Sequence, residues 1–294
     1  MRLARTTAYA TAAALALTLS ACGDDDETAS TDVEVAEGCD EFDSGTTMLE
    51  LCEAGEVTIG VKTDQPGIGF LEPGAEAPTG FDIEMGRIVA GALGIEDSGI
   101  TWEETISDNR EPFLVDGVVD IVIASYSITA DRAKLVGQAG PYYVTGQQLL
   151  VRQEDAETIA SPEDLEGVSV CSVTGSTSLT TVEDEYGAEP VAFDTYSQCV
   201  DALESGETDV LTTDGAILLG YEAENPDELQ VTGEEFSVER YGIGYEKGDT
   251  AMCEFLTDTI EQSYENGTWE QAFESTLGQS GVETPKPPET DPCP

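Results

Sequence analysis

The amino-acid sequence predicts an α/β protein made of two units. Its 294 residues exceed the length of one average domain. Between residues 56 and 280, segments with a strand pattern alternate with segments that have the periodicity of helices. One strand segment, residues 118–124, is almost continuously apolar, as is typical of a parallel strand buried on both faces. These observations predict two α/β units with parallel-type sheets.

The predicted elements of the first unit lie between residues 57 and 124. Residues 57–61 (VTIGV) form a β-branched run that predicts the first strand. Residues 81–93 predict a helix, whose apolar side chains share one face: Phe81, Met85, Ile88, Val89 and Ala92. Residues 100–106 and 118–124 predict two further strands.

A second cycle starts at residues 147–151. Ser161 followed by Pro162 predicts a helix N-cap with proline at the first helical position. Further elements follow in order: strands at 168–173 and 191–193, a helix at about 197–204 and a strand at 209–211.

The carboxyl-terminal part is predicted to be helical before an extended tail. Gly267 is expected to end one helix, and Thr268 with Gln271 forms a capping-box pattern for the next. Residues 283–294 contain five prolines, so they are expected to be extended.

The amino-terminal end has the features of a secretory signal, residues 1–21. Arg2 and Arg5 precede a mostly apolar stretch that is shorter than the ~20 residues of a membrane span. Residues 19–22 (LSAC) resemble the lipobox of bacterial lipoproteins, which implies that cleavage leaves Cys22 as a diacylated amino terminus anchored in the membrane. An ordinary signal peptide with a nearby cleavage site is the alternative.

Residues 22–55 are expected to form an acidic tether and a disulfide-bearing extension. Residues 23–38 hold seven acids and no base, which favours a solvated chain. If Cys22 carries lipid, six cysteines remain, and an even number in an exported chain favours disulfides. Fifteen pairings are possible, but the cysteines fall in three separated pairs. We therefore expect the disulfides Cys39–Cys52, Cys171–Cys199 and Cys253–Cys293.

The composition excludes several functions. Eleven basic residues against 61 acidic ones give a net charge of -50, so phosphates are repelled and no nucleic-acid partner is expected. The chain has no histidine, so Ser-His-Asp and Cys-His catalysis lack their general base and zinc sites lose their commonest nitrogen ligand. We expect no metal, no cofactor and no enzymatic activity.

Five segments together carry a family resemblance over about residues 56–280. They are residues 61–67 (VKTDQPG), 80–84 (GFDIE), 120–132 (DIVIASYSITADR), 141–143 (PYY) and 213–215 (TDG). Their order and spacing resemble the extracellular solute-binding proteins for polar amino acids that serve ABC importers. Residues 61–67 and 107–112 (SDNREP) look most like the glutamate/aspartate-binding branch.

The resemblance implies a two-lobed, type II periplasmic-binding fold with a two-strand hinge and a ligand cleft between the lobes. Lobe 1 is expected at residues 56–149 and 242–283, and lobe 2 at residues 150–241. The hinge crossings are expected near residues 147–152 and 239–247, and a proline-rich tail at 284–294.

Two residue groups are expected to hold the α-carboxylate and the ammonium group of an amino acid. Arg132 follows the serines Ser125 and Ser127 at a strand end, and its planar fork suits an α-carboxylate, a role that the family's matching arginine has. Asp214 also ends a strand, and its family counterpart accepts hydrogen bonds from the ligand ammonium. An exposed surface arginine and a helix N-cap aspartate are the respective alternatives.

Two further groups are expected to hold carboxylates. Residues 175–177 (GST) follow a strand and open a helix, so Ser176 and Thr177 form an anion cradle or simply cap the helix. Lys62 and Arg110 each follow a strand, at positions that resemble those contacting the distal carboxylate in acidic-amino-acid binders. Exposed pairs with surface acids are the alternative for both cations.

The implied function is capture of L-glutamate or L-aspartate at the extracytoplasmic face of a bacterial cell membrane. Hinge closure would present a surface to the permease subunits of an ABC transporter. ATP hydrolysis would belong to a separate subunit, because the chain lacks a G-x-x-x-x-G-K-S/T loop. A ligand-sensing lipoprotein and a periplasmic lyase or dehydratase on the same fold are the alternatives.

Overall fold

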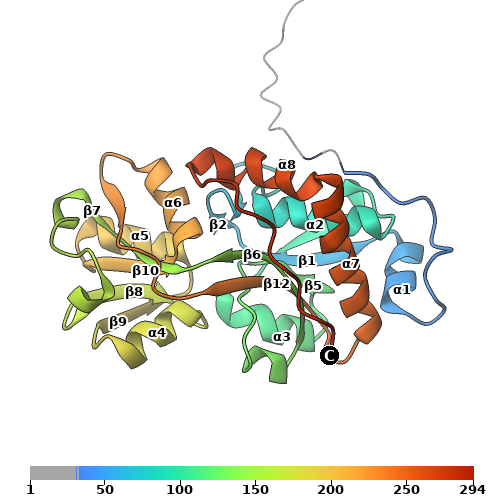
Figure 1. Ribbon diagram of the computed structural model, residues 1–294, viewed down its shortest axis with the longest axis horizontal. Coiled ribbons are helices and arrows are strands. Elements are labelled where there is room, and N and C mark those ends of the chain that lie inside the picture. The colour runs from blue at the N-terminus through green and yellow to red at the C-terminus, as the bar shows by residue number, and fades with distance from the viewer. Residues whose placement is uncertain (1–30, 32) are drawn as a thin grey trace, which may run out of the picture.

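The computed structural model describes residue 31 and residues 33–294, and this part of the chain folds into two lobes side by side (Figure 1). The sheet of lobe 1 has the order β4 (Ile100–Glu104), β1 (Val57–Val61), β5 (Ile121–Val122), β12 (Glu239–Tyr245) and β6 (Gly137–Thr145). The sheet of lobe 2 has the order β11 (Leu229–Thr232), β7 (Gln147–Arg152), β10 (Val210–Asp214), β8 (Ser169–Val173) and β9 (Glu189–Phe193). The predicted α/β class and two-lobed architecture agree with this arrangement.

Both sheets are mixed, so the expectation of parallel-type sheets is wrong in part. β1 runs parallel to β4 and β5, but β12 runs antiparallel to β5 and β6. In lobe 2, β8 runs parallel to β9 and β10, whereas β7 runs antiparallel to β10 and β11. The reason is the double crossing between lobes: β6 leads the chain out of lobe 1 and β12 leads it back, so the two strands run in opposite directions.

The two crossings are short. The first lies between the end of β6 at Thr145 and the start of β7 at Gln147, and the second between the end of β11 at Thr232 and the start of β12 at Glu239. The chain therefore passes from one sheet to the other a few residues before the divisions expected at 149/150 and 241/242. The cause is that β7 and β12 each belong wholly to the lobe that they enter.

Helices cover both sheets. Those of lobe 1 are α1 (Thr47–Ala54), α2 (Phe81–Ala92), α3 (Arg110–Val115), α7 (Thr250–Asn266) and α8 (Thr268–Ser275). Those of lobe 2 are α4 (Thr177–Glu185), α5 (Tyr196–Ser205) and α6 (Gly215–Glu224). The Phe81 ring at the start of α2 packs edge-on against Trp269 and Phe273 of α8, which joins these two helices in the core. None of the helices within the described residues is long and apolar enough to cross a bilayer.

Three local expectations are corrected. The strand expected at 118–124 is assigned as β5 only at Ile121–Val122, although backbone hydrogen bonds from Asp120 to Thr58 and from Ile123 to Gly60 continue its alignment with β1. Thr268 does not cap α8, because Gly267 in the left-handed conformation ends α7 and directly precedes α8. Ser161 does form a capping box, but with a short 3-10 turn at Pro162–Leu165.

The end of the acidic segment at residues 23–38 packs on lobe 1 instead of being solvated. The Thr31 backbone N-H donates to Glu84 of α2, and that of Ala36 donates to the Gly91 carbonyl. Val33 fits over Gly91, where a Cβ atom would stand only 2.6 Å from its methyl group. The missing side chain of Gly91 thus provides the space. The signal at residues 1–21 and Cys22 lie outside the described residues.

The structure contains the three disulfides that the cysteine spacing predicts. They are Cys39–Cys52, Cys171–Cys199 and Cys253–Cys293, with Cα–Cα distances of 5.8, 5.6 and 5.9 Å. The last one ties the extended proline-rich tail to α7, as expected.

Gly80 fixes where α2 begins, and this generates a stability prediction. Its φ is +125°, and a Cβ atom would stand 2.4 Å from the Ile68 carbonyl group. Gly80→Ala is therefore expected to lower the free energy of unfolding by about 3 kcal/mol or more, from backbone strain plus a clash with main chain. Gly74→Ala is the matched control, since Gly74 has φ +94° but open space around it, and should lose only ~1 kcal/mol. Urea unfolding measures both, and equal losses would contradict the close-contact explanation.

Candidate functional site

A small, mostly polar cavity lies where the two lobes meet. Its walls are Ser107, Arg110, Ser125, Ser127, Arg132, Ser176, Thr177, Ser178, Tyr196, Asp214 and Ile217. The volume is about 10 Å³, roughly the space of one water molecule. Residues from both lobes therefore nearly touch across it, and an amino acid can enter only if the lobes move apart.

Arg110 forms part of the floor of this cavity on the lobe 1 side. It is the first residue of α3 and only 2% exposed. Its guanidinium donates to four backbone carbonyls: Ser107 (3.1 Å), Ala124 (3.1 Å), Ser125 (3.1 Å) and Gly175 (3.2 Å). The first three belong to lobe 1 and the last to lobe 2. In the described part of the chain Arg110 makes no ion pair, and its hydrogen-bond partners are all carbonyl dipoles.

Arg132 lies beside Arg110 but has an acidic partner. Its Nε donates to Glu111 (3.1 Å), and its two Nη atoms donate to the carbonyls of Ser127 (2.7 Å) and Gly175 (2.9 Å). The side chain is nearly buried, which argues against the surface-arginine alternative. One carbonyl of lobe 2, that of Gly175, thus accepts hydrogen bonds from both arginines.

A tyrosine supports the two guanidinium groups. The ring centroid of Tyr126 lies 4.7 Å from Cζ of Arg110 and 5.0 Å from Cζ of Arg132. A ring face attracts cations through its quadrupole, so this contact stabilises two like charges in one place. The two arginines still repel each other. Burial, and after it the positive charge of Arg132, lowers the pKa of Arg110 to about 10.

Asp214 faces the arginines from lobe 2. It ends β10 and precedes α6, but its side chain does not cap that helix. Its Oδ2 instead accepts a hydrogen bond from the Tyr241 hydroxyl of lobe 1 (2.6 Å), and its buried Oδ1 has no hydrogen-bond partner among the described residues. Burial raises the pKa of Asp214 to about 7, and the negative charge of Glu239 acts in the same direction.

The loop and helix start at residues 175–177 combine two roles. Ser176 is the N-cap of α4 and accepts from the Leu179 N-H (3.0 Å), so the helix-capping alternative holds for its hydroxyl. Thr177 donates to Glu239 on β12 (3.0 Å) and so connects α4 to the hinge strand. Both residues also line the cavity, as the anion-cradle expectation requires.

Lys62 is the one predicted cation that does not reach the cavity wall. It is buried directly after β1, and its Nζ donates to the Ser107 hydroxyl (2.8 Å), which does line the cavity. Burial, followed by repulsion from Arg110, lowers the pKa of Lys62 to about 7. The structure therefore places Lys62 behind Ser107, and its contact with a distal carboxylate stays a prediction.

Several direct bonds join the lobes around the site. Besides the contacts of Gly175, Thr177 and Asp214, the Asp64 carboxylate of lobe 1 accepts from the backbone N-H of Tyr196 at the start of α5 (2.7 Å). The Tyr221 hydroxyl of α6 donates to the Asp64 carbonyl. These bonds stabilise the closed arrangement.

Four residues of the cavity wall are absent from the sequence-based prediction: Ser107, Ser178, Tyr196 and Ile217. Ser107 follows β4, at the same carboxyl edge as the predicted residues, so its position at a strand end was the available signal. The other three lie at the starts of α4, α5 and α6, where the sequence carries no distinguishing pattern.

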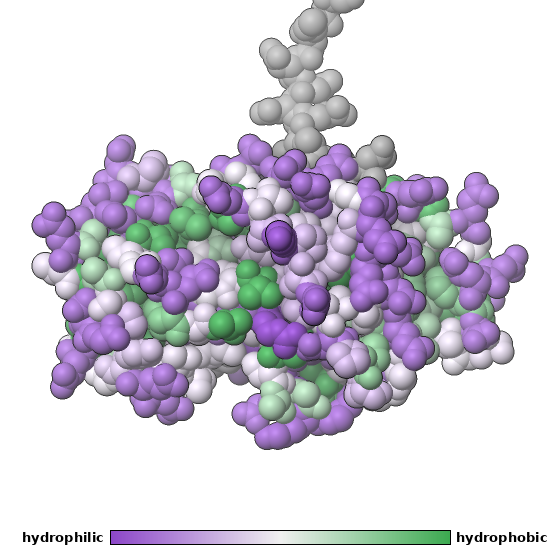
Figure 2. Space-filling view, viewed as in Figure 1, coloured by the Kyte–Doolittle hydropathy of each residue, from purple (hydrophilic) through white to green (hydrophobic). Residues whose placement is uncertain are grey.

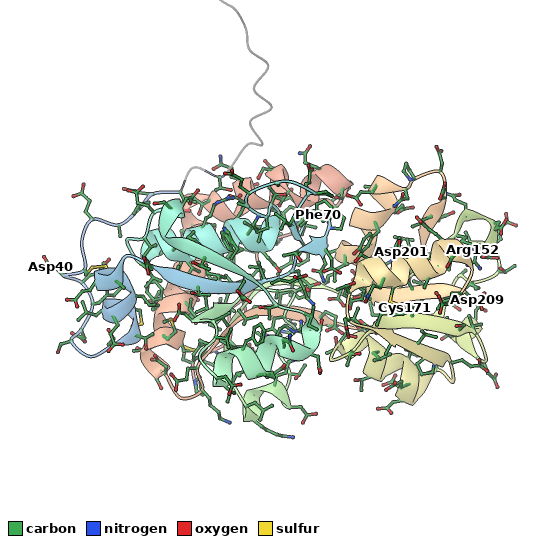
Figure 3. All side chains as sticks on the ribbon, turned by 180° about the vertical axis from the view of Figure 1, so that it is seen from behind. Asp40, Phe70, Arg152, Cys171, Asp201 and Asp209 are labelled. Carbon is green, nitrogen blue, oxygen red and sulfur yellow. A yellow bond between two sulfur atoms is a disulfide. The ribbon has the colours of Figure 1, made fainter. Side chains whose placement is uncertain are left out.

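A second, wider hollow of about 350 Å³ also spans the lobes, and Phe70 of lobe 1 and Asp201 of lobe 2 both line it (Figure 3). Its other acids are Asp64, Glu204 and Glu224, and none of its lining residues is basic. It therefore does not suit an anionic ligand. Within the described residues, no cluster of acids is arranged to hold a metal ion.

The family model of the bacterial extracellular solute-binding proteins, family 3, matches residues 57–279. The glutamate-binding protein GluB of Corynebacterium efficiens is 38% identical over 94% of this chain and 91% of its own length. The ABC transporter glutamine-binding protein GlnH of Bacillus subtilis is 31% identical over 81% of this chain and 86% of its own length.

Solved structures agree with this likeness. The structure of an ancestral arginine-binding protein bound to glutamine is 32% identical, with a TM-score of 0.71, and covers 76% of this chain and 98% of its own. The proteins named in these comparisons bind glutamate, glutamine or arginine, so the comparisons support amino-acid binding but leave the choice of amino acid to the site.

The raised pKa of Asp214 makes stability depend on pH. Its usual value of 3.8 rises to about 7 in the folded state, so between about pH 4 and pH 7 the folded state holds a proton that the unfolded state has lost. The free energy of unfolding therefore falls as pH rises through this window. Asp214→Asn should reduce that fall by up to about 4 kcal/mol.

Urea unfolding at pH 4 and pH 7 checks this prediction. Asp116→Asn is the control, since it removes one negative charge from an exposed position away from the cavity. If the free energy of unfolding depends on pH in both variants as it does in the unmodified protein, Asp214 is not the cause of the pH dependence. A slope in the same direction should persist in Asp214→Asn, because burial also raises the pKa of Asp82 to about 6.

Proposed function

Because the chain belongs to the bacterial extracellular solute-binding proteins of family 3, we propose that it binds an acidic amino acid, L-glutamate or L-aspartate, between its lobes. The observation that carries this proposal is the charge arrangement of the cavity. Two buried arginines of lobe 1 face one carboxylate of lobe 2, and one oxygen of that carboxylate has no hydrogen-bond partner in the part of the chain that the structure describes. An acidic amino acid has the complementary set of two carboxylates and one ammonium group.

Each charged group of the ligand has a suitable partner. Asp214 Oδ1 is the acceptor for the ammonium group, and a cation there would also favour the ionised carboxylate. The fork of Arg132 holds the α-carboxylate, helped by Ser127 and the N-H groups at the start of α4. Arg110 holds the distal carboxylate, with Lys62 behind Ser107 adding positive charge.

The difference between the two arginines supports this division of roles. Glu111 already offsets the charge of Arg132, whereas among the described residues Arg110 donates hydrogen bonds only to carbonyls. A second ligand carboxylate therefore gains the most binding free energy at Arg110. A neutral amide, as in glutamine, would leave that charge without an anion.

Binding would proceed by lobe opening and closure. The Gly175 carbonyl holds both arginines in the closed structure, and ligand carboxylates are stronger acceptors for the same donors. Contacts with both lobes would make the closed state the preferred one for the complex.

We further propose that the closed complex delivers its ligand to the permease subunits of an ABC transporter, with a separate ATPase. The family and the name of the Bacillus subtilis relative support this step. The lipobox-like residues 19–22 support attachment to the extracytoplasmic face of the cell membrane through Cys22. A sensor lipoprotein would use the same site residues, and loss of glutamate uptake on deletion of a neighbouring permease gene would favour transport.

Calorimetric titration of the protein from residue 23, with disulfides oxidised, tests the ligand. L-glutamate or L-aspartate is expected to bind with micromolar or lower Kd, about -8 kcal/mol or better. Glutamine and asparagine should bind much more weakly, because they lack the second carboxylate. Tight binding of glutamine with no binding of either acid would contradict the proposed ligand while leaving amino-acid binding intact.

Substitution of Arg110 tests the division of roles between the arginines. Arg110→Met is expected to weaken glutamate binding by about 2 to 5 kcal/mol, because a buried ligand carboxylate loses its cation. Glutamine should lose only about 1 kcal/mol, the worth of a neutral hydrogen bond. The measurement is calorimetry with both ligands.

The matched control is Arg132→Met, which should weaken glutamate and glutamine alike, since both carry an α-carboxylate. Far-ultraviolet circular dichroism checks that both variants are folded. Equal losses for the two ligands in Arg110→Met would remove Arg110 from the distal site.

A further inference from the structure

Asp82 is a buried carboxylate that the proposed recognition does not use. It belongs to the segment 80–84 at the start of α2, outside the cavity wall, and is 0% exposed. A buried carboxylate is costly unless its oxygens are hydrogen-bonded. Both oxygens of Asp82 are: Oδ2 accepts from the backbone N-H of Ser125 (2.7 Å), and Oδ1 accepts from the Tyr142 hydroxyl (2.6 Å).

Ser125 has an unusual backbone conformation. Its φ is +42°, and it is the only non-glycine residue with positive φ in the part of the chain that the structure describes. A side-chain-bearing residue keeps this conformation only where its surroundings hold it there. The hydrogen bond to Asp82 is one such restraint, and it comes from a firmly placed group, because the N-H groups of Phe81 and Asp82 donate to the carbonyls of Gly67 and Ile68.

The backbone conformation of Ser125 also positions the side chain of Arg110. Nη1 of Arg110 donates to the carbonyls of both Ala124 and Ser125, each at 3.1 Å. The direction of these two carbonyls depends on the left-handed conformation of Ser125. A continuous chain of hydrogen bonds therefore leads from Asp82 through Ser125 to Arg110.

The charge of Asp82 suits the same role. Lys62 and Arg110 repel each other, and the negative charge of Asp82 acts against that repulsion by favouring the charged form of Lys62. Both cations also favour the ionised form of Asp82, although burial raises its pKa to about 6. Asp82 thus offsets the buried positive charge from a position that leaves the cavity free for an anion.

We propose that Asp82 is a positioning residue: it holds Ser125 in its left-handed conformation and so directs Arg110 toward the ligand carboxylate. This inference rests on the proposed function, because it assigns Asp82 an effect on ligand affinity. A carboxylate that only stabilised the fold would change stability without a specific effect on the ligand.

Three variants separate the two possibilities. Asp82→Ala removes both acceptor oxygens, and, unlike Asp82→Asn, it offers no amide group from which the Tyr142 hydroxyl could accept instead. Tyr142→Phe is the matched control, since it removes the other hydrogen bond of Asp82 and leaves that of Ser125. Ser125→Gly supplies a residue that adopts positive φ without support, so the role of Asp82 should shrink in its presence.

Calorimetry with L-glutamate and L-glutamine, together with thermal unfolding, gives the readouts. Asp82→Ala is expected to weaken the binding of L-glutamate by about tenfold, the effect of losing the buried acceptor of the Ser125 N-H. Tyr142→Phe should weaken the binding of L-glutamate by no more than about twofold, even if it lowers Tm as much as the Asp82 variant does. In the Ser125→Gly background, the further loss of affinity from Asp82→Ala should be less than about threefold.

Two results would overturn the role of Asp82 in a protein that binds L-glutamate. One is a loss of affinity in Tyr142→Phe equal to that in Asp82→Ala. The other is an equal loss of affinity from Asp82→Ala with and without Ser125→Gly. An unmodified protein that binds neither L-glutamate nor L-aspartate would overturn the proposed function itself, and this inference with it. Ligand binding by the unmodified protein therefore distinguishes failure of the Asp82 inference from failure of the proposed function.

Discussion

The structure depends on two arginine side chains that are buried where the lobes meet. A buried cation is costly unless hydrogen-bond acceptors surround it. Within lobe 1, Arg110 donates to three backbone carbonyls, and Arg132 donates to one backbone carbonyl and to the Glu111 carboxylate. Each has one Nη atom left, and both of these atoms donate to the Gly175 carbonyl of lobe 2. The need of the arginines for an acceptor thus holds the lobes together, and an anion between the lobes would meet the same need.

The local field of the site opposes the field of the whole protein. The chain carries a net charge of -50, and polar residues cover much of both lobes on the face shown in Figure 2. Screening limits that field to ~8 Å at physiological salt, so an anion inside the cavity responds mainly to the groups on its wall. There two arginines face one aspartate, with Lys62 close behind, and the local charge favours carboxylates.

Much of the site could be predicted because its residues share one simple position. Parallel strands end at the same edge of a sheet, and the family resemblance placed the cleft between the edges of two such sheets. Ser125 of lobe 1 was therefore expected to face Asp214 and the residues after β8 of lobe 2. The aromatic partners could not be found in this way. Tyr196 lies at the start of α5, Tyr126 contacts the guanidinium groups with its ring face, and Tyr241 comes from the returning strand β12. These positions depend on contacts between distant segments.

By itself, the sequence determined the α/β class, the family, most element positions and the three cysteine pairs, because local periodicity, motif spacing and cysteine grouping each carry that information. Only the tertiary structure decided which cations reach the cavity, that both sheets are mixed and that Ser125 is held in a left-handed turn by Asp82. The physical reason is that burial and hydrogen-bond partners are set by strand register and by the approach of two lobes. Residues as far apart as Asp82 and Ser125 acquire their roles only when the sheet brings them together.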